Sequence, residues 1–398
     1  MYNSLKHHGL LNTKPKISSS FKLGILGGGQ LGKMLIQAAS KWDINIIVLD
    51  PDEQCSCATL CHEFHHGSFK DYDTVYNFGK KVDLLTFEIE HINIDAIKDL
   101  ELEGLKVFPQ SSALTIIQDK GLQKQFYQSH QFPTSSFQLF NNKEEILTAI
   151  SNNTISLPFI QKSRKEGYDG KGVILIKNEN DLSKLFDVPS LIEEYIAIDK
   201  EIAVIASRNE NGQIITFPTV EMEFSEEANL VEQLICPSSI PNKIDNKAQK
   251  LAMDIIEQLD MVGNLAVEFF ISKEGEILVN EVAPRPHNSG HHTIEANLTS
   301  QFEQHLRAIL NFPLGSTKLV SPSVMINLLG EPNHEGNVVY SNIEKCLSKE
   351  GVNIHIYGKK TTKPFRKMGH VTITDENLDK AKEKANFVKN NLTVISYE

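Results

Sequence analysis

Two acidic residues in one predicted β-hairpin are the sharpest chemical feature of the chain. The segment VEFFISKEGEILVNE is typical of two strands joined by a two-residue Glu274-Gly275 turn. Counting back from that turn places Glu268 opposite Glu281, with Cβ atoms about 5 Å apart. Carboxylates this close, among apolar neighbours, favour a cation between them, and oxygen ligands of this kind suit Mg²⁺ with phosphate oxygens. A register shifted by one residue would instead turn one acid toward solvent.

A proline-rich loop with several polar side chains follows this hairpin directly. It reads APRPHNSGHH, and its Arg285, His287 and Asn288 are suited to binding or orienting a substrate next to a metal-bearing strand. A zinc site is not favoured, because the loop has no cysteine.

A glycine-rich turn near the start of the chain suggests phosphate binding. Gly27, Gly29 and Gly32 fit the pattern G-x-G-x-x-G after a predicted strand, and Asp50 ends the next strand. Glycines in this pattern let backbone N–H groups approach a phosphate, as in dinucleotide-binding proteins. The motif alone is weak, since a tight turn that packs a helix against a sheet has the same sequence.

A second glycine-rich segment, GYDGKG at residues 167–172, lies between two predicted strands. It is not a P-loop, because no Gly-Lys-Ser/Thr leads into a helix. Its glycines, with Lys165 and Lys171 beside them, are suited to a lid over nucleotide phosphates. An ordinary solvated hairpin loop is the alternative interpretation.

A basic run, YGKKTTKPFRKMGH, stands out late in an otherwise acidic chain. Basic runs usually form a solvated face. This one flanks a predicted strand, and its Lys and Arg side chains suit a single phosphate group.

The elements that position these residues change character along the chain. The first part alternates strands with helices, which predicts a parallel, doubly wound sheet; its strand candidates are 22–26, 44–50, 82–88 and 106–108. The remainder predicts a mixed α+β fold, with a helix over 119–130, strands at 158–162 and 173–177, hairpin-like strands from about 200, and helices near 246–259 and 300–311.

Composition limits the classes of protein that fit. With 398 residues, 40% of them apolar, the chain is long enough for two or three packed domains. A net charge of −11 argues against a nucleic-acid surface, and no apolar run of about 18 residues is present to span a membrane. The polar first 20 residues predict a flexible extension without a signal-peptide core. Five cysteines, an odd number, fit a reducing cytoplasm.

In this order, GGGQLGKM, GYDGKG, the acid pair ending in NE, APRPHNSGH and KPFRKMGH resemble the 5-(carboxyamino)imidazole ribonucleotide synthases, which are ATP-grasp enzymes of purine biosynthesis. The resemblance covers about residues 21–375, and PRPHNSGH with RKMGH is its most specific part. It implies an α/β and α+β fold of the ATP-grasp architecture. The implied parts are a flexible leader (1–20), a Rossmann-like domain (21–118), a lid subdomain (119–195), a catalytic subdomain (196–320) and a C-terminal segment completing the catalytic lobe and the substrate phosphate site (321–398).

The resemblance also implies an activity and its ligands. ATP and bicarbonate would form carboxyphosphate, and the carbon dioxide released from it would be captured by the exocyclic amine of aminoimidazole ribonucleotide. The expected cofactors are ATP and Mg²⁺, with Mn²⁺ as a substitute, and bicarbonate is a co-substrate. A cytoplasmic homodimer that binds neither nucleic acid nor membrane is expected.

Site residues follow from the same resemblance, motif by motif. ATP would be bound by Lys120, Lys162, the loop Gly167, Tyr168, Asp169, Gly170, Lys171, Gly172 and Val173, the hinge Glu193, Glu194, Tyr195 and Ile196, then Glu201, Asn280 and Glu281. Substrate would be bound by Gln30, Leu31, Glu88, Tyr168, Asp169, His287, Lys359, Arg366 and Lys367. The metal ligands would be Glu268 and Glu281, and the catalytic residues Lys171, Arg285, His287 and Asn288.

Three features depart from the family pattern. The leader lies outside the resemblance. Phe224 stands where many members have a histidine near the nucleotide, and the basic motif reads KPFRK where RPGRK is commoner.

Other functions remain open at this point. Another ATP-grasp ligase, such as formate-dependent glycinamide ribonucleotide transformylase, would share the fold. An NAD-dependent dehydrogenase would use the first glycine turn and Asp50, but would leave GYDGKG and the acid pair unexplained. A non-catalytic nucleotide-binding regulator would have little need for opposed carboxylates. A cluster of Cys55, Cys57, Cys61, His62, His65 and His66, in a predicted loop or short helix, lacks the usual Cys-x2-Cys zinc spacing, and we interpret its cysteines as incidental.

Overall fold

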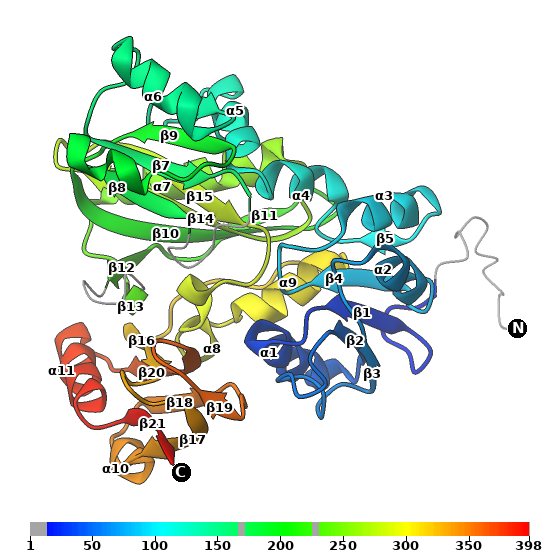
Figure 1. The fold of residues 1–398 in the computed structure, drawn as a ribbon. Helices are drawn as coiled ribbons and strands as arrows, with labels where there is room; N and C mark the ends of the chain where they lie inside the picture. The colour runs from blue at the N-terminus through cyan, green and yellow to red at the C-terminus, as the bar shows by residue number, and fades with distance from the viewer. Residues whose placement is uncertain (1–13, 166–171, 225–230, 398) are drawn as a thin grey trace, which may run out of the picture.

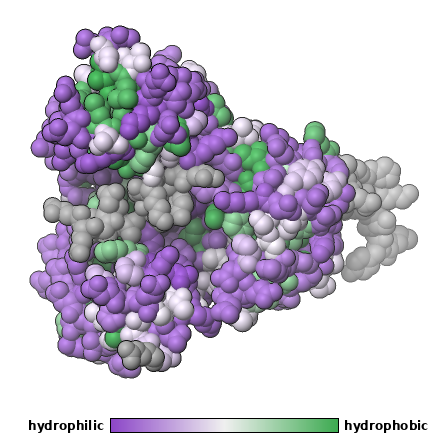
Figure 2. All heavy atoms as spheres, viewed as in Figure 1, coloured by the Kyte–Doolittle hydropathy of each residue, from purple (hydrophilic) through white to green (hydrophobic). Residues whose placement is uncertain are grey.

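A computed structural model of the chain describes residues 14–165, 172–224 and 231–397. Within these ranges the chain forms four β-sheets with helices packed on their faces (Figure 1). None of the helices in the described part is long and apolar enough to cross a membrane. Figure 2 shows mainly hydrophilic residues on the viewed face, with smaller apolar patches among them. Most buried apolar side chains gather in cores between the sheets and helices.

The N-terminal sheet is parallel, as the alternating pattern predicts. Its strand order is β3-β2-β1-β4-β5, from β1 (Lys22–Leu26), β2 (Asn45–Asp50), β3 (Glu63–His66), β4 (Leu84–Phe87) and β5 (Lys106–Val107). Helices α1 (Gln30–Ala39), α2 (Tyr72–Gly79) and α3 (Ile94–Leu102) pack on it. Strand β3 was not predicted, because it is a short, half-exposed edge strand without an apolar run. The segment expected to be only loop or short helix therefore ends in this strand.

A second, antiparallel sheet follows two linking helices, α4 (Ser111–Ile117) and α5 (Lys120–Ser129). Its order is β6-β9-β7-β8, from β6 (Phe137–Phe140), β7 (Phe159–Ser163), β8 (Val173–Ile176) and β9 (Ser190–Glu194). Helix α6 (Lys143–Ser151) covers one face through Ile146, which packs with Phe159 and Ile192.

The largest sheet has nine strands and runs through the remainder of the chain. Its order is β15-β14-β10-β12-β13-β16-β20-β18, with β11 paired to β10. The strands are β10 (Ile198–Arg208), β11 (Ile214–Thr216), β12 (Val220–Phe224), β13 (Val231–Cys236), β14 (Gly263–Ser272), β15 (Ile277–Ala283), β16 (Ser323–Leu329), β18 (Val352–Ile356) and β20 (Lys367–Thr374). The last three show that the C-terminal part continues this sheet.

Helices and a small sheet complete this part of the molecule. The helices are α7 (Asn242–Gln258), α8 (Thr293–Ala296), α9 (Gln301–Ile309), α10 (Ile343–Leu347) and α11 (Leu378–Lys389). The small sheet has the order β19-β17-β21, from β17 (Gly336–Ser341), β19 (Thr361–Thr362) and β21 (Thr393–Tyr397).

Helix α9 joins the N-terminal sheet to the nine-stranded sheet (Figure 1). Its Phe302 and Leu306 share a core with Leu23 of β1. Its buried His305 lies 3.0 Å from the Thr86 hydroxyl on β4 and accepts the Asn264 N–H of β14. These contacts fix the two sheets relative to each other, and the candidate site lies where they meet.

Candidate active site

The predicted acid pair forms, although the hairpin differs from the prediction at two points. The Ser272 N–H donates to the Glu276 carbonyl, so the loop has three residues and not the predicted two, and Gly275 takes its left-handed position at φ +81°. Asn280 is then an extra residue at an irregularity between the Glu268 and Phe269 registers. The two differences cancel, and Glu268 pairs with Glu281 as predicted.

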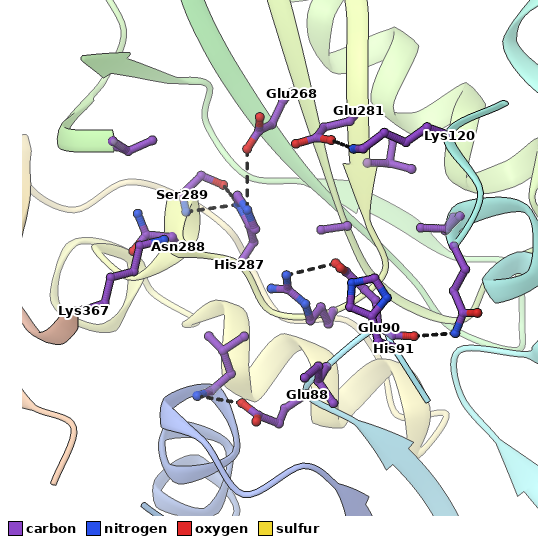
Figure 3. A pocket seen from close by; sticks show the side chains of 18 of the residues that line it. Glu88, Glu90, His91, Lys120, Glu268, Glu281, His287, Asn288, Ser289 and Lys367 are labelled. Carbon is purple, nitrogen blue, oxygen red and sulfur yellow. Dashed lines mark hydrogen bonds and ion pairs between the residues drawn. The ribbon is translucent and has the colours of Figure 1, made fainter. Parts of the chain in front are cut away.

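The two paired carboxylates have opposite electrostatic environments. Burial raises the pKa of Glu268, and the nearby negative charges of Glu281 and Glu201 raise it further. The Lys120 ammonium, bonded to Glu281, holds the pKa of that carboxyl well below its usual range against the effect of burial. Burial raises the pKa of Glu201 on β10 to about 7. Figure 3 shows Glu268, Glu281 and Lys120 together, with His287 Nε2 3.6 Å from Glu268.

Lys120 is positioned by residues that the sequence analysis did not single out. Asp119 caps helix α5 by accepting the N–H groups of Gly121 and Leu122. The same carboxylate accepts two hydrogen bonds from the Arg164 guanidinium, at 2.9 and 2.8 Å. The Lys120 N–H donates in turn to the Arg164 carbonyl. This bidentate pair ties the start of α5 to the end of β7.

Lys162 lies in a second charged cluster beside the acid pair. Its ammonium bonds the Asn280 side chain at 3.0 Å and Glu193 at 2.6 Å. Glu193 also pairs with Lys124 of α5, a buried residue that the sequence analysis missed. Burial opposes ionisation of Glu193, but the two lysines outweigh it and lower its pKa to about 2. The i, i+4 pattern of helix α5 is ordinary and does not indicate that the Lys124 side chain points inward.

The four residues of the predicted hinge differ in their exposure to solvent. Glu193 is buried on β9, whereas Glu194 and Tyr195 are exposed and Ile196 is half-buried in the turn before β10. Glu193 thus lies with the lysines, whereas Glu194, Tyr195 and Ile196 lie in more exposed positions.

The APRPHNSGHH loop reaches the same cavity from the other side. Arg285 forms an ion pair with Glu90 at 2.9 Å, and His287 lies between Glu268 and the Ser289 hydroxyl, which is 2.9 Å from its Nδ1 (Figure 3). Asn288 begins a single 3₁₀ turn beside them. The sequence analysis predicted these loop residues but not Glu90, the acid that Arg285 binds.

The glycine turn at the start of α1 is filled by the protein's own carboxylates. Glu88 accepts the N–H groups of Gly29, Leu31 and Gly32 at 2.8 to 3.1 Å, and Asp50 accepts that of Gly28 at 2.6 Å. These are the amides that would bind a dinucleotide phosphate. The geometry therefore opposes the dehydrogenase interpretation of this motif.

Two cavities open between the lobes and share the wall that carries Glu88. The larger, of about 570 Å³, brings together predicted residues from all lobes: Gln30, Leu31, Glu88, Lys120, Phe224, Glu268, Glu281, Arg285, His287, Asn288 and Lys367. The smaller, of about 280 Å³, contains Lys359 and Arg366. The three basic residues predicted for one phosphate are thus divided between the two cavities, Lys367 in the larger and the other two in the smaller. The Lys359 ammonium donates to the Lys367 carbonyl at 2.7 Å.

The basic loop keeps a strained backbone where the sequence departs from the family. Phe365 has φ +60°, a left-handed conformation that glycine adopts without penalty. The Phe365 N–H donates to the Gly330 carbonyl, and the Gly330 N–H donates to the Arg366 carbonyl. These bonds hold the loop in shape with phenylalanine at the position where glycine is commoner.

Part of the predicted nucleotide lid cannot be placed. Gly167, Tyr168, Asp169, Gly170 and Lys171 lie outside the described residues. The two residues after them are placed: the Gly172 carbonyl accepts the Ser163 N–H at 2.8 Å, and Val173 pairs with Lys162 at the start of β8.

The cysteine and histidine cluster after β2 has other roles. Cys57 is buried in the N-terminal core, and the His62 ring accepts the Ile46 N–H through Nδ1. In the part of the chain that the structure describes, no three His, Cys, Asp or Glu side chains are placed to hold a metal ion together, and the cysteines are free.

Comparison with known proteins defines first a class and then a family. Residues 21–118 match the model of the ribonucleotide synthetase preATP-grasp domain, and residues 125–302 match that of the ATP-grasp domain. Residues 323–384 match the phosphoribosylaminoimidazole carboxylase C-terminal domain. The chain therefore has the ATP-grasp fold preceded by its characteristic N-terminal domain.

Individual relatives identify a family within this class. The N5-carboxyaminoimidazole ribonucleotide synthase of Bacillus subtilis is 37% identical over 90% of this chain and 92% of its own length. The crystal structure of the Thermotoga maritima synthetase of that name matches with a TM-score of 0.87 and 42% identity, covering 95% of this chain and all of that one. An Aspergillus clavatus N5-carboxyaminoimidazole synthase, solved with ADP and 5-aminoimidazole ribonucleotide, matches with a TM-score of 0.84 and 30% identity, over 93% of this chain and 98% of that one.

The chain belongs to the N5-carboxyaminoimidazole ribonucleotide synthase family. It spans 64% and 65% of the length of two other curated relatives, from Vigna aconitifolia and Candida glabrata, which are named phosphoribosylaminoimidazole carboxylase.

The Lys124–Glu193–Lys162 cluster predicts a pH-dependent contribution to stability. Glu193→Gln leaves two buried lysines without a carboxylate, and we expect a loss of about 3 kcal/mol in unfolding free energy at pH 7. Because the pKa of Glu193 is lowered from 4.5 to about 2, its contribution is complete above about pH 5 and is lost as the pH falls toward 2. Urea unfolding at pH 7, 5 and 3 should show the two proteins converging.

Glu274→Gln, which changes an exposed carboxylate in the hairpin loop, is the matched control and should leave the unfolding curve unchanged at pH 7. A Glu193→Gln protein as stable as the wild type at pH 7 would contradict the assigned ion pairs.

Proposed function

We propose that the protein is an ATP-grasp ligase that carboxylates the exocyclic amine of 5-aminoimidazole ribonucleotide, using ATP and bicarbonate and releasing ADP and phosphate. One observation carries the proposal: the opposed carboxylates Glu268 and Glu281, with Lys120, share one cavity with the PRPHNSGH loop. The family supports it, as does the ligand pair named for the Aspergillus clavatus structure.

In the proposed reaction a bicarbonate oxygen attacks the γ-phosphorus of ATP, and the bond to ADP breaks. The resulting carboxyphosphate separates into carbon dioxide and phosphate. The amine nitrogen then bonds to the carbon of carbon dioxide and loses a proton, which gives the carbamate. This chemistry needs positioning and charge neutralisation more than a protein nucleophile, and Lys120 and Lys162 supply positive charge. Carboxyphosphate reacts readily with water, so closure over the cavity has a physical purpose.

The residues present fit Mg²⁺, which we propose as the metal cofactor, with Mn²⁺ as a substitute. Glu268 and Glu281 are opposed and half-buried. The pKa of Glu268 is raised by burial and by the negative charges of Glu281 and Glu201, whereas Lys120 lowers that of Glu281. Two carboxylates leave the other positions of an octahedral ion to phosphate oxygens and water. When bound, the ion would neutralise charge on the transferring phosphate.

We assign the other residues from the resemblance to the family, and those that the structure describes also from their place around these groups. Adenine would lie at the 193–196 hinge, and Glu201, with a pKa of about 7, can both donate to and accept from ribose hydroxyls. The ribonucleotide would occupy the side of the cavities that carries Gln30, Leu31 and Glu88, its phosphate bound by Lys359 and Arg366, with Lys367 nearby. Arg285, His287, Asn288 and Lys171 would orient the reacting groups.

We also propose a homodimer in a reducing cytoplasm. The dimer follows from the resemblance to the family, and the free cysteines fit that compartment.

The direct test is ADP release by the purified full chain with Mg²⁺, ATP and bicarbonate. We expect addition of 5-aminoimidazole ribonucleotide to stimulate release, with one carbamate formed per ADP. Absence of stimulation would overturn the proposed substrate.

Glu281→Gln removes one negative oxygen from the acid pair and the partner of Lys120. We expect kcat to fall by about 100-fold or more, because the metal ion that would neutralise the transferring phosphate is held less tightly, and excess Mg²⁺ should restore part of it. The control Glu276→Gln alters an exposed carboxylate directly before the same strand and should match the wild type. Unchanged turnover in Glu281→Gln would remove this residue from the metal site.

Arg366→Met tests the phosphate assignment. Arg366 lines the smaller cavity and bonds the Thr361 carbonyl at 2.7 Å. We expect the KM for the ribonucleotide to rise about tenfold or more, since a charged hydrogen bond contributes about 1.5–3 kcal/mol, with little change in kcat or in the KM for ATP. Lys363→Met, an exposed change in the same loop, is the control. Equal KM values for both variants would place the phosphate elsewhere.

A further inference from the structure

The side chain of Gln301, at the start of α9, fixes the protonation of a cavity histidine. Its Oε1 accepts the His287 N–H at 2.8 Å, and its Nε2 donates to the His287 carbonyl at 2.7 Å. Because one residue supplies both a backbone donor and a backbone acceptor, the amide can take only one orientation. Its Nε2 also lies 3.1 Å from Nδ1 of His291.

This contact determines the tautomer of His291. Nε2 of Gln301 is only a donor, so Nδ1 of His291 must accept and carries no proton. A neutral imidazole then has its proton on Nε2, and a doubly protonated ring is excluded because two N–H groups would face each other. Burial and the positive charges around the ring also disfavour the doubly protonated form, and they hold the pKa of His291 well below its usual value.

The His291 ring is held rigidly at the cavity wall. It lines the 570 Å³ cavity and packs against Phe302 and His370, with ring centres 5.9 and 4.7 Å away. Gly290 lets the loop lie close to α9, because a Cβ there would come within 2.5 Å of the Gln301 Oε1. Across the described residues, the bond from Gln301 is the one side-chain hydrogen bond of this ring. Although the residue is 1% exposed, its ring lines the cavity, so the Nε2–H is the polar group left to meet a ligand there.

We propose that His291 is a neutral hydrogen-bond donor to the aminoimidazole ring of the ribonucleotide, and that Gln301 is the positioning residue that keeps the proton on Nε2. This inference rests on the proposed function. The unsubstituted ring nitrogen of an aminoimidazole has a lone pair to accept such a bond. A flat, uncharged heterocycle suits a site walled by aromatic rings, whereas bicarbonate, an anion, suits the lysines.

The local charges also favour this assignment over the phosphate. Lys359 lies over the Tyr357 ring, which is in edge contact with His291, and Lys367 precedes His370 by three residues. These lysines already supply positive charge, so a neutral donor near them adds a directed hydrogen bond without further charge.

Two substitutions separate the donor from the rest of the ring. In His291→Gln the amide NH₂ reaches toward the position of Nε2, whereas in His291→Asn it stays near that of Nδ1. We expect His291→Asn to raise the KM for the ribonucleotide about fivefold to tenfold, as for one neutral hydrogen bond, and His291→Gln to raise it less than half as much. The KM for ATP and the thermal unfolding midpoint should be alike in the two variants.

His292→Asn is the control, because His292 is equally buried in the same turn but does not line the cavity. It should leave the KM for the ribonucleotide at the wild-type value. Equal KM values for His291→Gln and His291→Asn, in a wild-type background that is stimulated by the ribonucleotide, would overturn the donor role alone. A wild-type protein without that stimulation would overturn the proposed function and the ligand assigned to His291 with it.

The role of Gln301 has a readout that needs no turnover and no substrate. In the ¹⁵N-histidine-labelled full chain, the signal lost in His291→Asn identifies the ring nitrogens of His291. We expect the Nε2–H tautomer, unchanged between pH 6 and 8. Gln301→Glu cannot donate to Nδ1, so its His291 should become protonated at Nδ1. An Nδ1–H or charged ring in the wild type, or the same spectrum in Gln301→Glu, would overturn the positioning role.

Discussion

Carboxylates buried between the lobes must be matched by positive charge, and most of the site's geometry follows from how that charge is supplied. An unpaired buried carboxylate costs several kcal/mol, so each one needs a cation or a proton. Glu281 is matched by Lys120, and Glu193 by Lys124 and Lys162. Among the described residues, the ion-pair partner of Glu268 is a histidine at 3.6 Å. The weaker compensation thus lies in the acid pair that β-sheet register brings together, which is where a bound cation would relieve it.

The same requirement explains what could and could not be predicted from the sequence. The parallel N-terminal sheet and the Glu268–Glu281 pair follow from local patterns of apolar residues and turns. The pair was nevertheless obtained through a wrong loop length that the extra residue Asn280 cancels. Lys124 is a different case, because its partner Glu193 is distant in the sequence and no local pattern links them. Tertiary partners of this kind require the assembled lobes.

The first glycine turn shows why a motif is weaker evidence than the atoms it meets. Its N–H groups do form an anion site, as the pattern predicts, but the anion is the Glu88 carboxylate from the end of β4. Burial raises the pKa of this carboxyl, while the glycine amides act in the opposite direction. A helix start that would otherwise attract a phosphate is thereby neutralised, and the proposed nucleotide site lies instead in the lobes that carry Lys120 and Lys162.

The remaining part of the cavity combines positively charged side chains with uncharged histidines. Lys359, Arg366 and Lys367 are the basic side chains that can supply positive charge here. The histidines packed among them are buried, and burial lowers the pKa values of His291 and His370 well below the usual value. Such rings cannot add charge, but their N–H groups keep fixed directions. For the proposed ribonucleotide, one set of residues would attract the anionic phosphate and the other would orient the uncharged ring.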